Sequence, residues 1–396
     1  MRIKASTFVG YPLPLPPFPE QYRIVAEIEK QFTRLDAGVA ALERAQANLK
    51  RYRASVLKAA CEGRLVPAEA ELARAEGRDY EPADRLLARI LKERRAKWEA
   101  DQLAKMQAQG KMPKDNKWKE KYQEPEGPDT VDLPELPEGW VWTTVDQLTG
   151  AEDGMTTGPF GTLLGKSDQR STGVPVVGIP NITETGFAQG NWFYITPEKA
   201  EALRKYRLLP GDLVVSRPGT VGESCLVPEM PTPTIMSTNL MRLRVVSSSG
   251  IAAWLVVNFK GSPTIHFQLA ELCKGSTRPF LNLSILCRLF VRLPPTIEQY
   301  RIIAEVERRL SIVDELEIAI AANLKRAERL RQSILKRAFE GKLVPQDPKD
   351  EPASVLLERI RAEHQVEQKA TAKAISKPNQ KSKRPQVAET QAELFH

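Results

Sequence analysis

The sequence predicts an α+β fold, in which one α/β-mixed domain accompanies two long helices packed as an antiparallel coiled coil. Three observations lead to this prediction. One segment of the chain is duplicated, apolar residues recur every seven positions in both copies, and the stretch between the copies is rich in glycine and in short strand-like runs.

The duplication joins two distant parts of the chain. Residues 15–28 (LPPFPEQYRIVAEI) return as residues 293–306 (LPPTIEQYRIIAEV), and Ser55–Pro67 (SVLKAACEGRLVP) returns at the same offset as Ser333–Pro345 (SILKRAFEGKLVP). Each copy is therefore predicted to form the same structural unit.

The first copy carries a heptad pattern from Glu20 onward. Prolines at 16, 17 and 19 prevent the helix from extending backwards, and Gly63 and Pro67 end it. About 40 residues at 1.5 Å each give a helix of roughly 60 Å. Gln46 and Arg53 are polar members of the seam. The predicted apolar core residues are Val25, Ile28, Phe32, Leu35, Val39, Leu42, Leu49 and Val56.

The second copy repeats the pattern, with Glu317 and Ala327 as its departures. Two such helices in one chain can pack on each other, and antiparallel packing places the intervening domain at one end of the pair. Two helices that bind separate partners are the alternative. The core residues predicted here are Ile303, Val306, Leu310, Val313, Ile320, Leu324 and Ile334.

Shorter segments follow each long helix. Glu81–Asp84 (EPAD) and Glu351–Ser354 (EPAS) each begin a predicted short helix with proline in its first turn. Residues 92–126 are highly charged and predict a helix that runs into an exposed basic linker, which either contacts a partner or is merely solvated. From about residue 364 the chain is rich in Lys, Ala, Gln and Ser, and a disordered tail is expected.

The stretch between the copies has a different composition. Residues 175–179, 191–195, 212–216, 224–227 and 240–246 form β-rich runs separated by Gly, Pro and Asn. Residues 251–260 and 265–273 are predicted to be helices. Together they predict one α+β domain over residues 136–293.

The composition is that of a cytoplasmic protein. Hydrophobic residues make up 41% and charged residues 27%, no apolar run reaches membrane-spanning length, and the N-terminus has no export signal. Cys61, Cys225, Cys273 and Cys287 show no metal-ligand spacing, so a structural zinc site is not expected.

No motif for catalysis is found. The chain has no phosphate-binding glycine loop, no HExxH, no GxSxG and no Asn/Asp-Pro-Pro motif of a base methyltransferase. Asp168, Asp212 and Glu223 are possible metal carboxylates, but no compact nuclease set accompanies them. The sequence therefore predicts a protein that is not an enzyme.

The central domain has features suited to DNA binding. The chain has a net charge of +8, and residues 140–293 hold 14 Lys and Arg against 11 Asp and Glu. Basic and amide residues lie beside glycine or hydroxyl residues, where backbone N–H groups can approach phosphates. Any one of them could instead brace a turn. The candidates are Lys166, Ser167, Arg170, Asn181, Arg217, Thr220, Asn239, Arg242, Lys274, Ser276, Thr277 and Arg278.

These motifs resemble those of a known family. The doubled LPP-x-x-EQ-x-RI and S-[VI]-L-K…EG-[RK]-LVP segments are similar to the spacer regions of specificity (S) subunits of type I restriction-modification systems. LPEGW (136–140), GPFGTLLGKS (158–167), LLPGDLVVSRPGTVGES (208–224) and KGSTRPFLN (274–282) resemble the domain between those regions. The resemblance covers nearly the whole chain apart from the tail.

The resemblance implies a non-catalytic DNA reader. Members usually carry two target-recognition domains, each reading half of a split site, whereas only one complete domain is expected here. The expected parts are a stump of the first recognition domain (1–14), a first conserved spacer region (15–95), a charged linker (96–135), the target-recognition domain (136–293), a second conserved spacer region (294–363) and a disordered basic tail (364–396).

The resemblance also implies partners. These are double-stranded DNA, methyltransferase subunits, restriction subunits through the complex and, for the missing half-site, a second specificity polypeptide. No cofactor is expected in this chain, while S-adenosylmethionine, ATP and Mg are expected on the partner subunits. The alternative is a coiled-coil scaffold or a truncated remnant that does not read DNA by itself.

Overall fold

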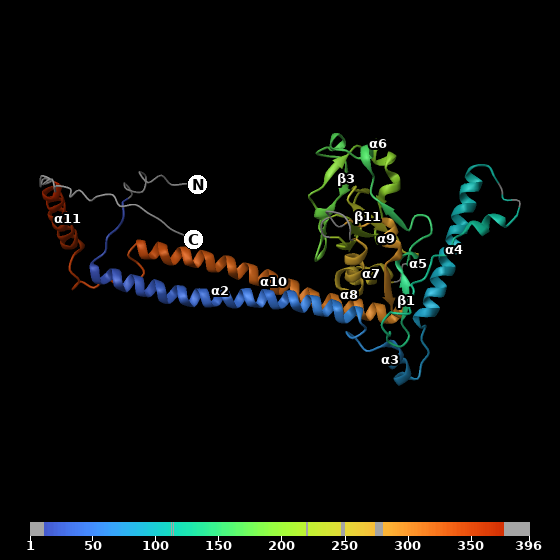
Figure 1. Ribbon diagram of the computed structural model, residues 1–396, viewed down its shortest axis with the longest axis horizontal. Helices are drawn as coiled ribbons and strands as arrows, with labels where there is room; N and C mark the ends of the chain where they lie inside the picture. The colour runs from blue at the N-terminus through green and yellow to red at the C-terminus, as the bar shows by residue number, and fades with distance from the viewer. Residues whose placement is uncertain are drawn as a thin grey trace, which may run out of the picture. The chain divides into compact units, whose positions relative to one another are not determined.

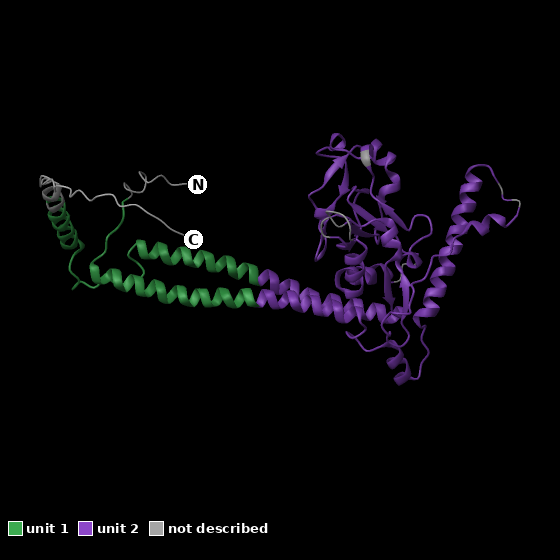
Figure 2. Ribbon diagram, viewed as in Figure 1, with its two compact units in different colours: residues 1–44, 320–396 green, residues 45–319 purple. Residues whose placement is uncertain are grey.

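A computed structural model describes residues 12–111, 113, 115–218, 221–246, 250–273 and 280–375. The chain divides into two compact units, residues 1–44 with 320–396 and residues 45–319 (Figure 2). Among the described residues, no helix combines the length and apolar character needed to cross a membrane.

Two 44-residue helices, α2 (Phe18–Cys61) and α10 (Thr296–Phe339), pair within each unit (Figure 1). In the first unit, Asp36 forms an ion pair with Arg331, whose guanidinium lies 4.7 Å from the centre of the Phe32 ring. In the second unit, Arg53 forms an ion pair with Asp314. A later position on α2 thus meets an earlier position on α10, so the prediction of antiparallel helices is confirmed.

Nearly all of the predicted heptad residues are buried or half-buried along the helix pair. Val25 is the exception, because its side chain is 52% exposed. Its place in the core was therefore predicted wrongly. The buried members are Val56, Val306, Val313, Ile320 and Ile334. The half-buried members are Ile28, Phe32, Leu35, Val39, Leu42, Leu49, Ile303, Leu310 and Leu324.

Arg53, a polar residue in the seam of α2, is buried and forms several ion pairs. In addition to its pair with Asp314, its Nη2 donates at 3.2 Å to Glu317, the polar residue that interrupts the heptad pattern of α10. Its Nε lies 3.4 Å from a carboxylate oxygen of Glu184, in the turn between strands β4 (Ile182–Thr183) and β5 (Gly186–Phe187). A buried charge is tolerated only when it is paired, so Arg53 ties the helix pair to this hairpin.

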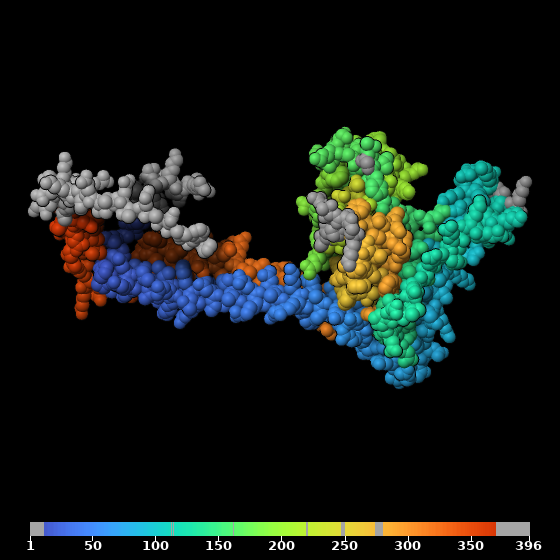
Figure 3. Space-filling view, viewed as in Figure 1, coloured from blue at the N-terminus to red at the C-terminus, as the bar shows by residue number. Residues whose placement is uncertain are grey.

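The mixed domain is built on two four-stranded sheets within the second unit (Figure 1). In the space-filling view the side chains of this domain pack into one continuous body (Figure 3). The first has the order β6-β3-β10-β7, in which only β3 and β10 are parallel. The second, β2-β11-β8-β9, is antiparallel throughout. The strands are β2 (Met155–Thr157), β3 (Val174–Val177), β6 (Phe193–Ile195), β7 (Arg207–Leu208), β8 (Leu213–Ser216), β9 (Ser224–Leu226), β10 (Thr234–Met236) and β11 (Leu240–Leu243).

A third pairing closes the domain at its two ends. Strand β1 (Val141–Thr144) runs antiparallel to β12 (Phe290–Leu293), with Val141 opposite Leu293. The first and last residues of the domain therefore lie side by side, next to the start of α10. The helices of the domain are α5 (Val145–Leu148), α6 (Pro197–Ala202), α7 (Ile251–Gly261), α8 (Pro263–Leu272) and α9 (Leu283–Arg288), and the two predicted over 251–273 are confirmed as α7 and α8.

The core of the second unit joins the mixed domain to the helix pair. Trp254 of α7 is fully buried, and Leu57 of α2 belongs to the same cluster. The backbone of Gly261 approaches α2 so closely that a Cβ there would lie 2.2 Å from the Cβ of Leu57. Such an approach requires glycine.

Trp140, from the LPEGW segment, anchors the domain to the start of α10. Its indole Nε1 donates to Oε1 of the buried Glu298 at 3.0 Å, and the backbone N–H of Glu69 donates to Oε2 at 2.9 Å. Gly63 makes room, since a Cβ there would meet Pro137 at 2.7 Å. Burial is the largest influence on Glu298 and raises the pKa of its carboxyl above 4.5.

The raised pKa of Glu298 predicts a pH-dependent stability difference. As pH rises from about 4.5, the unfolded chain releases this proton while the folded chain keeps it, so the stabilisation falls until the folded pKa is passed. We expect Glu298→Gln, which cannot ionise, to lose most relative to the native chain at low pH and less as pH rises. Urea unfolding of both chains between about pH 4 and pH 7 measures this, and a pH-independent difference would contradict it.

The segments after the long helices differ from the predictions in two places. Helices α3 (Glu69–Glu76) and α4 (Ala83–Ala108) follow α2, and the charged stretch beyond α4 is not simply solvated. Trp118 in η1 (Lys117–Lys121) stacks on Trp98 of α4 at 6.0 Å. Helix α11 (Ala353–Ile375) continues past residue 364, so the tail was predicted to begin too early. Residues 1–11 and 376–396 lie outside the described residues.

Candidate nucleic-acid interface

Three connecting segments meet at one end of the strands of the antiparallel sheet. Strand β11 pairs with both β2 and β8, with Met241 opposite Thr157 and Leu240 opposite Ser216. The segments that follow β2 and β8 therefore lie beside the segment that precedes β11. A Cβ at Gly158, directly after β2, would lie 1.9 Å from the carbonyl oxygen of Ser237, so this convergence depends on glycine.

Arg217 lies at this convergence, directly after β8. Its guanidinium is sandwiched between the rings of Phe160 and Phe280, with centroids 4.7 and 4.5 Å away. Nε donates to the carbonyl of Leu281 at 3.3 Å, and Nη1 donates to the carbonyl of Thr238 at 3.2 Å. Nη2 has no hydrogen-bond partner within the described chain.

The charge of Arg217 is not compensated by the protein. The side chain is 3% exposed, yet none of the carboxylates in the described part of the chain forms an ion pair with it. Burial lowers the pKa of its guanidinium. A buried cation without a counter-charge is costly, so this site is suited to an anion from outside the chain.

Four other candidates are exposed near the strand ends. Lys166 and Ser167 belong to the short helix η3 (Lys166–Asp168), and Arg170 follows it. Asn239 lies in the turn between β10 and β11, where its carbonyl accepts the backbone N–H of Arg217 at 3.0 Å. Of these four, the structure brings only Asn239 into contact with Arg217.

Two candidates have internal roles, and their prediction as DNA contacts was wrong. Asn181 is buried, and its side chain accepts from Gly178 N–H at 2.9 Å and donates to the carbonyl of Ala188 at 2.9 Å. Arg242 is buried and paired with Asp153, and it donates to the carbonyl of Arg207 at 3.0 Å. In both cases pairing within the domain uses the polar groups that DNA would need. Thr220, Lys274, Ser276, Thr277 and Arg278 lie outside the described residues.

Two of the three possible metal carboxylates are also engaged. Asp212 is buried and accepts from Arg244 Nε at 2.7 Å, and Asp168 pairs with Lys199 at 3.1 Å. Within the described ranges, no cluster of three His, Cys, Asp or Glu residues could hold a metal ion.

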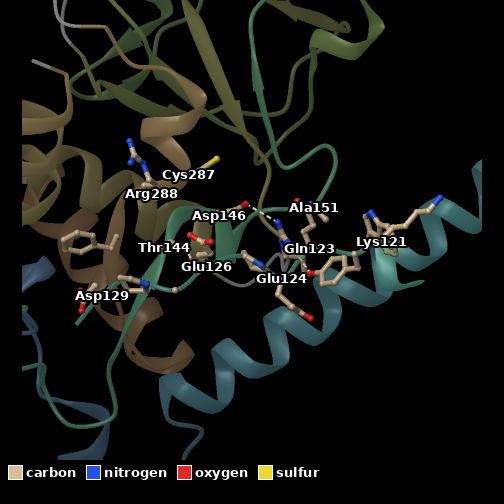
Figure 4. A pocket seen from close by; sticks show the side chains of 17 residues that line it. Lys121, Gln123, Glu124, Glu126, Asp129, Thr144, Asp146, Ala151, Cys287 and Arg288 are labelled. Atoms are coloured by element: carbon tan, nitrogen blue, oxygen red, sulfur yellow. Dashed lines mark hydrogen bonds and ion pairs between the residues drawn. The ribbon is translucent and has the colours of Figure 1, made fainter. Parts of the chain in front are cut away.

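A polar cavity of about 640 Å³ opens between the α4–β1 segment and the mixed domain (Figure 4). None of the predicted DNA-binding residues lines this cavity. Arg94 at its wall donates to Tyr122 Oη at 3.0 Å and to Asp146 at 3.1 Å, so its charge is already balanced. We therefore regard the Arg217 region, and not this cavity, as the better candidate for binding an anionic ligand.

Phe160 and Phe280 were not anticipated from the sequence. Their side chains are 50% and 42% exposed, although both rings pack on Arg217. The available signal was an aromatic residue within a Gly/Pro loop, in GPFG and in TRPF. Exposed aromatic rings are suited to stacking on nucleic-acid bases as well as to holding a guanidinium.

Sequence comparisons show which proteins this chain is similar to. The EcoBI specificity subunit of Escherichia coli is 24% identical over 89% of this chain, and the EcoKI specificity subunit of Escherichia coli strain K12 is 21% identical over 91%. This chain is homologous to type I restriction enzyme specificity subunits. It spans 64% of the EcoBI specificity subunit and 55% of the EcoAI specificity subunit of Escherichia coli, which is 24% identical to it.

A structural comparison shows a fold shared with a chain of a type I R-M system. A chain from a solved structure, described as the structural basis of complex assembly and conformational transition of the type I R-M system, aligns with a TM-score of 0.52. The identity is 20%, and the alignment covers 84% of this chain and 62% of that one. No protein-family model matches the sequence.

Proposed function

We propose that this chain is the sequence-specific DNA-recognition subunit of a type I restriction-modification complex. The uncompensated cation of Arg217 carries the proposal, because it is held by two exposed aromatic rings where three connecting segments converge. DNA supplies both the phosphates that would balance this charge and the bases that could stack on the rings. Homology to specificity subunits is the independent support.

In this proposal the mixed domain over residues 136–293 reads one half-site. The spacer regions, 15–95 and 294–363, hold methyltransferase subunits, and restriction subunits join through the complex. The chain itself is non-catalytic and acts in the cytoplasm, with S-adenosylmethionine, ATP and Mg on its partners. A second specificity polypeptide would supply the other half-site.

The first test is the salt dependence of DNA binding. Neutralising several phosphates releases counterions, so we expect affinity to fall by roughly 10³-fold or more between about 50 and 200 mM salt. Fluorescence polarisation with a labelled duplex, using the chain together with its methyltransferase subunits, measures this. We also expect nuclease footprinting to show one protected half-site.

Two results would count against the proposal. A coiled-coil scaffold that does not read DNA would give a flat, weak salt profile that matches the methyltransferase subunits alone. Protection of two separated half-sites by a complex with a single copy of this chain would contradict reading by one domain.

A further inference from the structure

A strained loop joins β5 to β6 at the edge of the first sheet. Within the described ranges, Asn191 is the only residue other than glycine with a positive φ angle, 54°. The preceding Gly190 also has a positive φ angle, 95°. Residues other than glycine rarely adopt this conformation, and such strain is concentrated at functional sites. Gln189 and Asn191 are both exposed, so the loop presents two side-chain amides to solvent.

Trp192 adds a second unfavourable feature to the same loop. Its indole Nε1 is buried, and this atom has no hydrogen-bond partner in the part of the chain that the structure describes. A buried donor without an acceptor destabilises a fold. Two unfavourable features in consecutive residues indicate that this loop is shaped by something other than stability.

Asn181 fixes the position of the loop. Its Nδ2 donates to the carbonyls of Ala188 and Gly190, at 2.9 and 2.6 Å. Its Oδ1 accepts the backbone N–H of Gly178 at 2.9 Å, and a Cβ at Gly178 would lie 3.6 Å from Oγ of Ser237. Ser237 belongs to the segment that precedes β11, where the three connecting segments converge. Asn181 therefore holds the loop close to the candidate nucleic-acid interface.

Uncompensated positive charge lies beside the loop. The backbones of Arg170 and Tyr194 exchange hydrogen bonds of 2.8 and 3.1 Å, so residues 166–170 lie next to the strand that follows the loop. Lys166 and Arg170 are exposed, and neither forms an ion pair with any described carboxylate. Asp168, the one carboxylate of this segment, is already paired with a lysine at 3.1 Å. Two free cations thus accompany the two amides.

We propose that Gln189 and Asn191 read base edges of the DNA half-site, while Lys166 and Arg170 bind the adjacent phosphates. The donor and acceptor of a side-chain amide match N7 and N6 of adenine in the major groove, so the base pair read is A·T. Lys and Arg contacts to phosphate position the DNA and carry no sequence information. The inference rests on the proposed function and deepens it, because it assigns base reading to residues separate from Arg217.

Asn191→Gly tests the base contact. Glycine adopts a positive φ without strain, so the backbone is kept while the amide is removed. Selection from a randomised duplex library, using the chain with its methyltransferase subunits, gives the base preference at each position. We expect the native complex to prefer A·T at one position by about tenfold or more, and Asn191→Gly to lose that preference and keep the others. The melting temperature should change little, because relief of strain offsets the greater freedom of glycine in the unfolded chain.

Three further variants separate base reading from charge. Gln189→Ala should lose preference at the same base pair or at the adjacent one. Lys166→Met should weaken binding to all sequences by a similar factor and reduce the salt slope by about 1, with the base preference unchanged. Gln107→Ala is the matched amide control, because Gln107 is exposed on α4, outside the mixed domain. It should change neither the preference nor the slope.

Three outcomes would overturn the inference. They are an unchanged base preference in Asn191→Gly, an equal loss of affinity for every sequence in that variant, and loss of a preference for G·C in place of A·T. All three leave the salt-dependent DNA binding of the native complex intact, so the proposed function stands in each case. Absence of salt-dependent binding by the native complex would overturn both.

Discussion

Arg217→Met is expected to lower the affinity of the complex for DNA by about a hundredfold or more, with only a small effect on folding. Removing a desolvated charge that pairs with a ligand typically costs several kcal/mol of binding. Methionine keeps the apolar packing between Phe160 and Phe280, and the lost hydrogen bonds are only those to two backbone carbonyls. Equilibrium DNA binding and thermal melting of the same preparations measure the two effects.

The matched control is Arg204→Met. It removes the same charge from the same domain, but its side chain is 78% exposed and, among the described residues, forms an ion pair only with Glu201. We expect a small loss of affinity there, of the size that one screened charge produces. Arg217→Lys should be intermediate, because it keeps the charge but not the planar group that stacks between two rings. Equal losses in the Arg217 and Arg204 variants would show that Arg217 has no special role.

Local periodicity was sufficient to predict the helical part of the fold. The seven-residue spacing of Leu35, Leu42 and Leu49 predicts a seam from the sequence alone, and the structure places all three half-buried. Val25 precedes Phe32 and Val39 at the same seven-residue spacing but is exposed. Periodicity specifies which face of a helix is apolar, while burial depends on what packs against that face. The sequence does not contain this information locally.

The candidate site could be predicted only in part, because burial is set by pairing between distant residues. Arg217, Arg242 and Asn181 are equally plausible DNA contacts by residue type. Arg242 pairs with Asp153, 89 residues away, and Asn181 bonds to a loop seven residues on, whereas Arg217 is buried without a carboxylate. The exposed Phe160 and Phe280 become informative only when Pro218 and Phe280 are known to pair across the fold.

The largest loss of stability is expected from Arg244→Met. Asp212 is 2% exposed and is bound through both carboxylate oxygens, by Arg244 Nε at 2.7 Å and Nη2 at 2.8 Å. Leu209 N–H donates the remaining bond, at 2.7 Å. Removal of Arg244 leaves a buried carboxylate without its ion-pair partner, which costs about 3–5 kcal/mol. For a domain of this size we expect a melting temperature lower by roughly 10 °C.

A double variant separates the ion pair from packing. Asp212→Asn removes the charge that Arg244→Met leaves unpaired, so the combined variant should recover part of the lost stability, and a double-mutant cycle gives the coupling. Arg204→Met again provides the surface control, with little change in melting temperature expected.

Arg244→Met and Arg217→Met should therefore have opposite effects on the stability of the free chain. A buried arginine with an ion-pair partner stabilises the fold, so its loss weakens DNA binding only because the domain unfolds. A buried arginine without such a partner destabilises the free chain, and binding of the anion would offset that cost. If Arg217→Met destabilised the chain as much as Arg244→Met, Arg217 would have to be regarded as a structural residue.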